Sequence, residues 1–330
     1  STPFRSVQKY VPNRDVYQAE AVMPVTTVAA GATSTVTTQF FAGAKEWEAI
    51  REYEREGVVR FLDSIDWGWF FFLTKPIFWL LHTLNVYIGN MGWSIIALTV
   101  IIKAIVLPLA YKSSVGMAKM KALQPDMEAL KEKAGDDKQA MQQGMMKLYK
   151  DNKVNPMSGC MPILLQIPIF FSLYKVIFVT IELRHAPWLA WITDLSAPDP
   201  SSILNLFGLL PFAPPDPSSL FALFSLGILP IILGVSMWLQ QKLNPAPTDP
   251  TQKMIFAWMP WVFMFMLGSF ASGLVLYWIA NNTITFIQQY TIMRMIGTKP
   301  DIFGNIFAGK RAAAEAAAKP ANTTKKPKDK

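Results

Sequence analysis

Five long apolar segments in the second two thirds of the chain predict membrane-spanning helices. Each is close to the roughly 20 residues that the hydrocarbon core of a bilayer requires. The last two meet at residues 269–273, which predicts a very tight hairpin. An odd number of spans places the two ends of this region on opposite sides of the membrane. The predicted spans are residues 93–111, 157–181, 219–241, 254–272 and 273–293.

The positions of Lys and Arg assign the sides of the membrane. Residues 112–153 contain nine Lys and residues 294–330 contain nine Lys or Arg, whereas residues 183–218 contain only Arg184. Cytoplasmic loops carry the excess of basic residues, so we expect 112–153 and the tail in the cytoplasm. Residues 183–218 and the N-terminal piece are then expected outside. The tail, 297–330, is expected to be disordered and could bind anionic lipid or nucleic acid.

Residues 1–62 predict a small β-rich piece followed by a linker helix. The runs 25–28 and 35–41 are rich in β-branched and aromatic residues, and about two to four strands fit before Gly43. A sheet this small is marginal by itself, so we interpret it as the end of a larger β-domain. The chain begins Ser-Thr-Pro-Phe without Met, which favours a fragment or processed form. Residues 44–62 are expected to be one helix with an apolar stripe at Trp47, Ile50, Tyr53 and Phe61.

Residues 63–92 predict an interfacial helix rather than a sixth span. The segment is apolar from Trp69 to Leu81 except at residues 74–76, and these 13 residues are too few to cross a bilayer. The Lys75-Pro76 pair is expected to break the helix in its middle. Three tryptophans suit the headgroup zone: Trp67, Trp69 and Trp79. A short helix buried in the core is the alternative interpretation.

The basic segment 112–153 predicts a helical hairpin in the cytoplasm. Gly135 is expected to end the first helix and Asp136 to cap the second. Both helices carry apolar residues at helical spacing, and many of them are methionine. The two stripes could simply pack on each other, or the methionines could form a soft surface for varied apolar partners. The methionines are Met117, Met120, Met127, Met141, Met145 and Met146.

Lys103 is the most informative single residue. It follows Trp93 by ten residues and precedes Tyr111 by eight, so it lies roughly 12–15 Å from either end of its span. A lysine stem reaches only about 6 Å, so its charge cannot snorkel to the surface. An unrelieved charge there costs about 2.5–3.5 kcal/mol or more, so it needs water, a partner or a shifted pKa. No other span contains a carboxylate in its interior, which favours a hydrated cavity.

Uncharged polar residues in the same span and in two others are the candidate walls of that cavity. Thr99 lies one turn before Lys103, and Gln166 is an amide inside the second span. The last span has one polar side, with Tyr277, Trp278, Asn281, Asn282, Thr285, Gln288 and Gln289. A positive, hydrated pocket between helices is therefore our hypothesis; alternatively these amides hydrogen-bond helix to helix. Lys175 is close enough to its span end to reach outward, and we assign it no role.

Composition supports a membrane protein and gives no sign of an enzyme. Hydrophobic residues make up 52% and charged residues 16% of the chain, against about 25% charged in ordinary soluble domains. His82 and His185 are far apart, and Cys160 has no nearby His. No glycine-rich phosphate loop and no metal-ligand spacing is present. We therefore expect neither catalysis nor a cofactor nor a metal.

A series of motifs in order resembles the YidC/Oxa/Alb membrane-protein insertase family over about residues 67–296. One is Gly92-Trp93-Ser94-Ile95-Ile96, which leads to Lys103 and Pro108-Leu109. The others are at 117–125, 135–139, 153–156, 159–162, 166–170, 182–184 and 272–278. Residues 1–62 resemble the end of the periplasmic β-domain of Gram-negative bacterial members. The family's first membrane segment is missing from this chain, which agrees with an N-terminal truncation.

The resemblance implies an all-α polytopic membrane protein of the bacterial inner membrane. It has a five-helix transmembrane core with a cytoplasmic helical hairpin (93–296), preceded by the remnant of a periplasmic β-domain. The family has a hydrophilic groove, open to the cytoplasm, with one basic residue that is usually Arg. Here Lys103 keeps the charge but loses the bidentate fork. The groove residues implied are Lys103, Thr99, Gln166, Tyr277, Trp278, Asn281 and Thr285.

The same resemblance implies how the protein acts and with what. Nascent membrane proteins would enter the groove, and their apolar helices would leave sideways into lipid. The hairpin methionines Met117, Met120, Met127, Met141 and Met145 would receive them. The ribosome, a Sec translocon and membrane lipid are the implied partners, and a monomer is the implied working form. The apolar, Pro-rich insertion near 208–227 departs from the family pattern, and its role does not follow from the sequence.

Two other classes of function compete with insertion. A small secondary transporter or channel usually has repeated halves and paired intramembrane charges, whereas this sequence shows no repeat and one buried charge. A scaffold whose hairpin merely docks partners would not need Lys103. Substitution of Lys103 therefore distinguishes insertion from a scaffold.

Overall fold

The computed structural model describes residues 4–135, 137–155, 161–213, 215, 219, 224–244 and 250–297. The chain divides into two units, Ser1–Ala44 and Lys45–Lys330. The first unit contains one antiparallel pair of strands, β1 (Arg5–Val11) and β2 (Val16–Val22). The pair is closed by a turn in which Tyr10 Oη donates to Asp15 Oδ1 over 2.9 Å.

The small sheet is present, but its predicted position was wrong. Residues 25–28 and 35–41 are not strands, although their composition favours them. Strand formation depends on cross-strand pairs and burial more than on intrinsic preference. Tyr10 and Tyr17 supply such a pair, with ring centroids 4.7 Å apart, whereas Val25 is 99% exposed. Residues 25–28 and 35–41 therefore have β-type composition without a partner strand.

The linker forms a shorter helix than predicted. Helix α1 (Trp47–Arg55) ends before Gly57, whose φ of +114° no other residue adopts easily. A separate 3-10 turn, η2 (Phe61–Ser64), follows, so the single helix predicted over 44–62 was wrong beyond Arg55. Ile50 is fully buried at the centre of the predicted apolar stripe.

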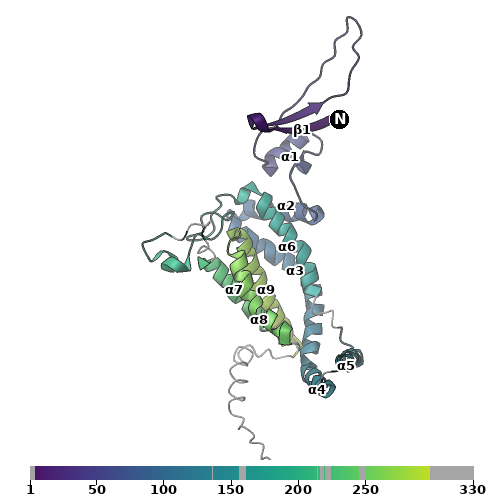
Figure 1. Ribbon diagram of the computed structural model, residues 1–330, viewed down its shortest axis with the longest axis vertical. Helices are drawn as coiled ribbons and strands as arrows, with labels where there is room; N and C mark the ends of the chain where they lie inside the picture. The colour runs from purple at the N-terminus through teal and green to yellow at the C-terminus, as the bar shows by residue number, and fades with distance from the viewer. Residues whose placement is uncertain are drawn as a thin grey trace, which may run out of the picture. The chain divides into compact units, whose positions relative to one another are not determined.

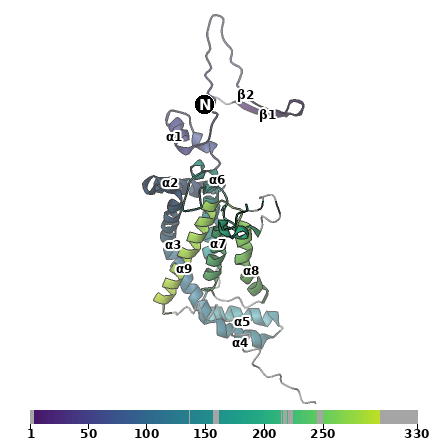
Figure 2. The ribbon, with the colours of Figure 1, turned by 90° about the vertical axis from the view of Figure 1, so that its left-hand side faces the viewer.

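Helix α2 (Phe71–Ile88) is continuous through the Lys75-Pro76 pair, contrary to the predicted break. Pro76 is the sixth residue of the helix, so only the carbonyl of Phe72 loses its intrahelical donor. The helix packs against α3 and α6. Figure 2 shows it lying crosswise to α3 and α9.

Helix α3 (Met91–Ala122) is 32 residues long and extends well beyond the predicted end at Tyr111. Its start is capped by Asn90 Oδ1, which accepts from the Trp93 amide at 3.2 Å. Neither Pro108 nor Gly116 interrupts it, and the turn comes only before Pro125. Met117 and Met120 therefore belong to the long helix and not to the hairpin.

The predicted helical hairpin consists of α4 (Gln124–Ala134) and α5 (Lys138–Asp151), which lie side by side (Figures 1 and 2). Gly135 separates them as predicted. The cap of α5 is Asp137, whose Oδ1 accepts from the amides of Gln139 and Ala140 at 2.9 and 3.0 Å. The predicted cap, Asp136, lies outside the described residues.

The described part of the second unit contains four further α-helices: α6 (Met161–Val179), α7 (Ile228–Gln241), α8 (Pro250–Leu267) and α9 (Ser272–Met295). The predicted tight connection between α8 and α9 is confirmed. The predicted start of the third span at 219 was wrong, since α7 begins at Ile228. Asp199 Oδ2 accepts from the Leu229 amide at 2.8 Å and caps the helix there. A Cβ on Gly227 would come within 2.5 Å of Asp199 Cγ, so the cap requires glycine.

Helices α3, α7 and α6 all pack against α9, and α8 packs against α7 (Figure 1). Buried apolar side chains fill the space between them, with Leu98, Leu173, Leu233, Leu274 and Tyr277 at most 1–2% exposed. Among the described residues, Met91–Ala122 is the one helix long and apolar enough to cross a membrane by length and composition. The segments Gln166–Val179 and Ile228–Gln241 are apolar but shorter.

Candidate functional site

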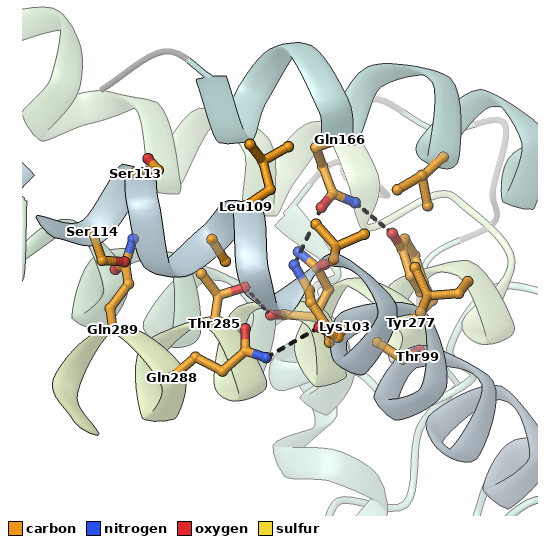
Figure 3. A pocket seen from close by; sticks show the side chains of 15 residues that line it. Thr99, Lys103, Leu109, Ser113, Ser114, Gln166, Tyr277, Thr285, Gln288 and Gln289 are labelled. Atoms are coloured by element: carbon orange, nitrogen blue, oxygen red, sulfur yellow. Dashed lines mark hydrogen bonds between the residues drawn. The ribbon is translucent and has the colours of Figure 1, made fainter. Parts of the chain in front are cut away.

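A pocket opens between α3, α6 and α9, with Lys103 in its wall (Figure 3). Its volume is about 60 Å³. Since one buried water needs about 10–15 Å³, roughly four waters fit. The lining residues are Thr99, Ile102, Lys103, Val106, Leu109, Ala110, Ser113, Ser114, Gln166, Ile169, Tyr277, Asn281, Thr285, Gln288 and Gln289.

Lys103 supplies the charge of this pocket. Its Nζ donates to Gln166 Oε1 over 3.3 Å, and its backbone carbonyl accepts from Gln288 Nε2 at 3.4 Å. No carboxylate is present among the described residues that line the pocket. A lysine ammonium has three donors, and the bond to Gln166 uses one of them. The remaining donors can bind water or an anionic group that enters the pocket.

Gln166 connects the lysine to α9. Its Nε2 donates to Tyr277 Oη over 2.5 Å, while its Oε1 faces Lys103 (Figure 3). Because both ends of the amide are engaged, its orientation is fixed. Tyr277 is 1% exposed, so this bond lies in a buried part of the pocket wall.

The polar residues of α9 divide into two groups. Asn282 donates from Nδ2 to Ser236 Oγ on α7 at 3.1 Å, which is the helix-to-helix role expected as the alternative. Asn281 and Gln289 line the pocket instead, and each has a buried side-chain oxygen without a hydrogen-bond partner among the described residues. Thr285 Oγ1 bonds to the carbonyl of Asn281 at 2.6 Å, within its own helix. Asn281 and Gln289 therefore have acceptors that water or a ligand could satisfy.

Six of the seven predicted groove residues line the pocket, and Trp278 is the exception. Thr99 lies in the pocket wall, but it is 1% exposed and its hydroxyl donates to the Ile95 carbonyl at 2.7 Å. Trp278 does not line the pocket: its ring packs against Phe170 on α6 at 5.2 Å, and its indole nitrogen has no partner among the described residues. The other five predicted residues line the pocket.

The sequence prediction missed the part of the pocket formed by Ser113 and Ser114. These residues follow Lys103 by three helical turns and lie on the same face of α3. They were overlooked because the span was predicted to end at Tyr111. Counting the helical spacing from Lys103 onward would have found them.

The hairpin methionines do not form one continuous exposed surface. Met127 is 8% exposed and packs with Leu123 and Val154. Met120 and Met145 pack against the same cluster, and Tyr149 Oη lies 3.8 Å from Met127 Sδ. For these three methionines the packing interpretation therefore agrees with the structure. Met117 instead lines a small pocket beside Ser114 and Met293. Met141 is half-buried, and Met146 is the most open at 66% exposed.

Ion pairs fasten the linker to helices α2 and α6. Lys175 pairs with Asp66, so it points outward as expected, and the hydrogen bond it donates lowers the pKa of that carboxyl group. Lys75 pairs with Asp63 at 2.9 Å and lowers its pKa in the same way. His82 lies between two carboxylates, 3.1 Å from Glu48 and 2.8 Å from Glu182. Within the described ranges, no group of three or more His, Cys, Asp or Glu side chains could hold a metal ion.

Comparisons with known proteins agree on one family. The model of the family described as 60Kd inner membrane protein matches residues 83–299, and that of the YidC periplasmic domain matches residues 1–80. A membrane protein insertase YidC from Ruegeria pomeroyi is 72% identical over 316 residues, covering 95% of this chain and 52% of that protein. One from Roseobacter denitrificans is 74% identical over 309 residues, covering 94% and 51%. The chain thus spans about half the length of the curated relatives it matches.

A solved structure has a similar fold. The crystal structure described as an active YidC insertase with the first transmembrane domain resolved has a TM-score of 0.50 and is 27% identical. The similarity covers 68% of this chain and 47% of the other. The periplasmic-domain match agrees with the interpretation of the N-terminal sheet as the remnant of a β-domain.

Proposed function

The chain belongs to the YidC family of membrane proteins, and we propose that it inserts nascent proteins into the bacterial inner membrane. The pocket that contains Lys103 would be the groove that receives them from the cytoplasm. The single observation that carries this proposal is the half-buried lysine beside an open cavity whose described lining holds no carboxylate. Such a site attracts an acidic or strongly polar segment and shields it from lipid.

The pocket would shorten the apolar distance that a polar segment must cross. A short extracytoplasmic segment of the substrate enters between α3 and α9 and replaces water around Lys103. Asn281 and Gln289 offer the acceptors that lack partners in the described structure. Buried donors and acceptors that are already fixed in place cost little to reorganise when the segment arrives. The substrate segment thus exchanges bulk water for a polar surface halfway through the bilayer.

Release into lipid would supply the driving force. Burying a substrate helix of roughly 20 apolar residues removes a large apolar surface from water. A membrane potential that is positive outside also favours outward movement of an acidic segment by about 2.3 kcal/mol per charge per 100 mV. No covalent bond forms or breaks in this process, so it requires no catalytic residue.

The other roles in the proposal follow from the charge pattern and the family. Residues 112–153 and the basic tail would face the cytoplasm, where the ribosome delivers the nascent chain. The N-terminal β-piece would be periplasmic. A Sec translocon would be a partner for some substrates, and the monomer would be the working form. Three of the six methionines lie outside the cluster of Leu123, Met127 and Val154, namely Met117, Met141 and Met146. Of these, Met146 is the most exposed and is the first candidate for contact with the substrate.

Site-specific photocrosslinking tests the proposal. A photoreactive residue replaces Gln288, which lines the pocket, in the full-length protein. The matched control places it at the neighbouring Ile287, which is 56% exposed and does not line the pocket. With a ribosome-stalled membrane protein whose extracytoplasmic segment is acidic, we expect crosslinks from 288 and far fewer from 287. Equal crosslinking from both positions, or crosslinks to lipid alone, would refute entry through the pocket.

A further inference from the structure

The segment that precedes α7 exposes an unusual apolar surface. Between Asp199 and Asp216 the chain has no charged residue. Seven large apolar side chains of this segment are exposed: Ile203, Leu204, Leu206, Phe207, Leu209, Leu210 and Phe212. Leu209 is 84% exposed. Contiguous exposed apolar surface of this kind marks a site of contact with a membrane or another protein.

Six backbone amides of this segment are hydrogen-bonded. The 3-10 turn η5 (Ile203–Gly208) is organised around Asn205, which is buried although its neighbours are exposed. Asn205 Nδ2 donates to the Phe212 carbonyl at 3.3 Å, and Asn205 Oδ1 accepts from the Gly208 amide at 3.0 Å. Five more amides have partners within the unit: those of Ile203, Leu204, Phe207, Leu209 and Leu210. Each such bond lowers the cost of placing a non-helical segment in lipid, where an unpaired backbone group has no water to bind.

The segment is fastened to the first turn of α7. The Ile203 amide donates to the Leu226 carbonyl at 2.8 Å, and the hydroxyls of Ser202 and Ser225 lie 2.7 Å apart. Ser201 Oγ accepts from the Ile228 amide at 2.9 Å. The exposed side chains are therefore held at the level where the helix begins.

Helix α7 is too short to cross a bilayer core by itself. Its 14 residues span about 21 Å at 1.5 Å per residue, against a hydrocarbon thickness of about 30 Å. A deficit of about 9 Å would leave the end of the helix below the lipid surface. The apolar segment fastened to that end supplies the missing apolar surface.

We propose that residues 203–212 are embedded in the outer leaflet of the bilayer and act as a lipid anchor for the short helix α7. Lipid acyl chains cover the exposed side chains, while Asn205 keeps the polar backbone satisfied beneath them. This assigns a role to the N-terminal part of the apolar insertion. The inference rests on the membrane placement of the proposed function, but not on insertion activity.

Electron paramagnetic resonance of spin labels tests the position of this surface. A nitroxide is attached at Leu209→Cys in a cysteine-free form of the full-length protein, in vesicles of phosphatidylethanolamine and phosphatidylglycerol. Oxygen concentrates in lipid and a nickel chelate in water, so the ratio of their accessibilities reports the surroundings of the label. Val25→Cys, at a 99% exposed position of the N-terminal unit, is the reference for water. Ile105→Cys, at a 72% exposed position of α3, is the reference for lipid.

We expect the oxygen-to-nickel ratio at 209 to exceed that at 25 severalfold and to approach that at 105. A ratio like that at 25 would place the segment in water and overturn the proposal. A label shielded from both reagents would indicate a protein partner or a second copy of the chain, and would overturn it equally. Phe212→Cys serves as a second position if the first variant does not fold. Because the label reports depth and not activity, failure here leaves the insertase proposal standing.

Discussion

Gln166 Nε2 donates to Tyr277 Oη over 2.5 Å, and this bond links α6 to α9 in the wall of the pocket. The same amide accepts from Lys103 through its other end, at 3.3 Å. One glutamine therefore couples the packing of two helices to the position of the charge. Rotation of this amide would turn its donor toward the ammonium group and lose the bond to Lys103, although the Tyr277 hydroxyl could still donate to the amide oxygen.

The first prediction concerns Tyr277→Phe. The variant removes the acceptor for Gln166 Nε2 and leaves a buried donor without a partner. We expect it to lower the free energy of unfolding by about 1–3 kcal/mol. Denaturant unfolding of the full-length protein in bicelles measures the change. Tyr174→Phe is the matched control, since Tyr174 packs through its ring against Phe178.

A double-mutant cycle isolates the bond itself. Gln166→Ala combined with Tyr277→Phe should show a coupling energy of about 0.5–3 kcal/mol, the range for residues in one network. Strictly additive effects of the two substitutions would contradict the proposed link.

The second prediction concerns the charge of Lys103. Lys103→Arg should support near-normal insertion, whereas Lys103→Ala should reduce insertion of substrates with acidic extracytoplasmic segments. Lys103→Glu should be more damaging because it repels such segments. A charge at position 103 changes the free energy of an acidic segment in the pocket by about 1–3 kcal/mol at the effective dielectric of a partly hydrated site. This corresponds to a change of about 5- to 150-fold in the partitioning of the segment into the pocket.

Insertion of matched substrates into vesicles measures this effect. A substrate with an acidic segment is compared with one in which the acidic residues are replaced by Asn or Gln. Lys112→Glu, at an exposed position on the same helix, controls for general charge effects. The charge role fails if Lys103→Glu inserts both substrates as well as the unmodified protein does.

The third prediction separates the two kinds of methionine in the hairpin. Met127→Ala removes a buried side chain from the cluster of Leu123 and Val154, and should destabilise the hairpin by about 2–5 kcal/mol. Met146→Ala changes a side chain that is 66% exposed and should leave stability nearly unchanged. Hydrogen exchange of residues 124–151 measures both. If Met146 receives substrates, Met146→Ala should lower insertion without faster hydrogen exchange. Faster hydrogen exchange in Met146→Ala and none in Met127→Ala would show that Met146, and not Met127, stabilises the hairpin.

The fourth prediction concerns acid release of the linker. The hydrogen bond from Lys175 lowers the pKa of Asp66, and that from Lys75 lowers the pKa of Asp63. Because these pKa values are lowered in the folded state, the ion pairs stabilise the linker at pH values above the ordinary aspartate pKa of 3.8. This stabilisation is lost as the pH falls through the lower pKa of the folded state. Hydrogen exchange of residues 57–68, measured at several pH values and corrected for the intrinsic rate, should lose protection only below about pH 4.

Asp66→Asn provides the control for this prediction. The amide cannot form the ion pair, so the variant should show reduced protection already at neutral pH and a weaker dependence on pH. An unchanged acid response in the double variant Asp63→Asn, Asp66→Asn would show that other groups release the linker.

The sequence by itself determined where apolar segments and charges lie. Spacing and composition alone give three features: the position of Lys103 inside an apolar run, the polar side of the last span and the short connection before Ser272. They could be predicted because helical periodicity is local: residues three or four apart share a face in any helix. The resemblance to the family also rests on the order of motifs along the chain.

Only the tertiary structure decided where elements begin and end and which polar groups meet. The strands formed at 5–11 and 16–22 because paired strands stabilise each other, not because their composition favours strands most. Helix α7 starts at Ile228 because Asp199, from a distant loop, caps it there. Gln166 bonds to Tyr277 and Lys103, whereas Asn282 bonds to Ser236, and nothing in their spacing distinguishes these amides. Hydrogen-bond partners far apart in sequence are selected by packing, which a local pattern does not contain.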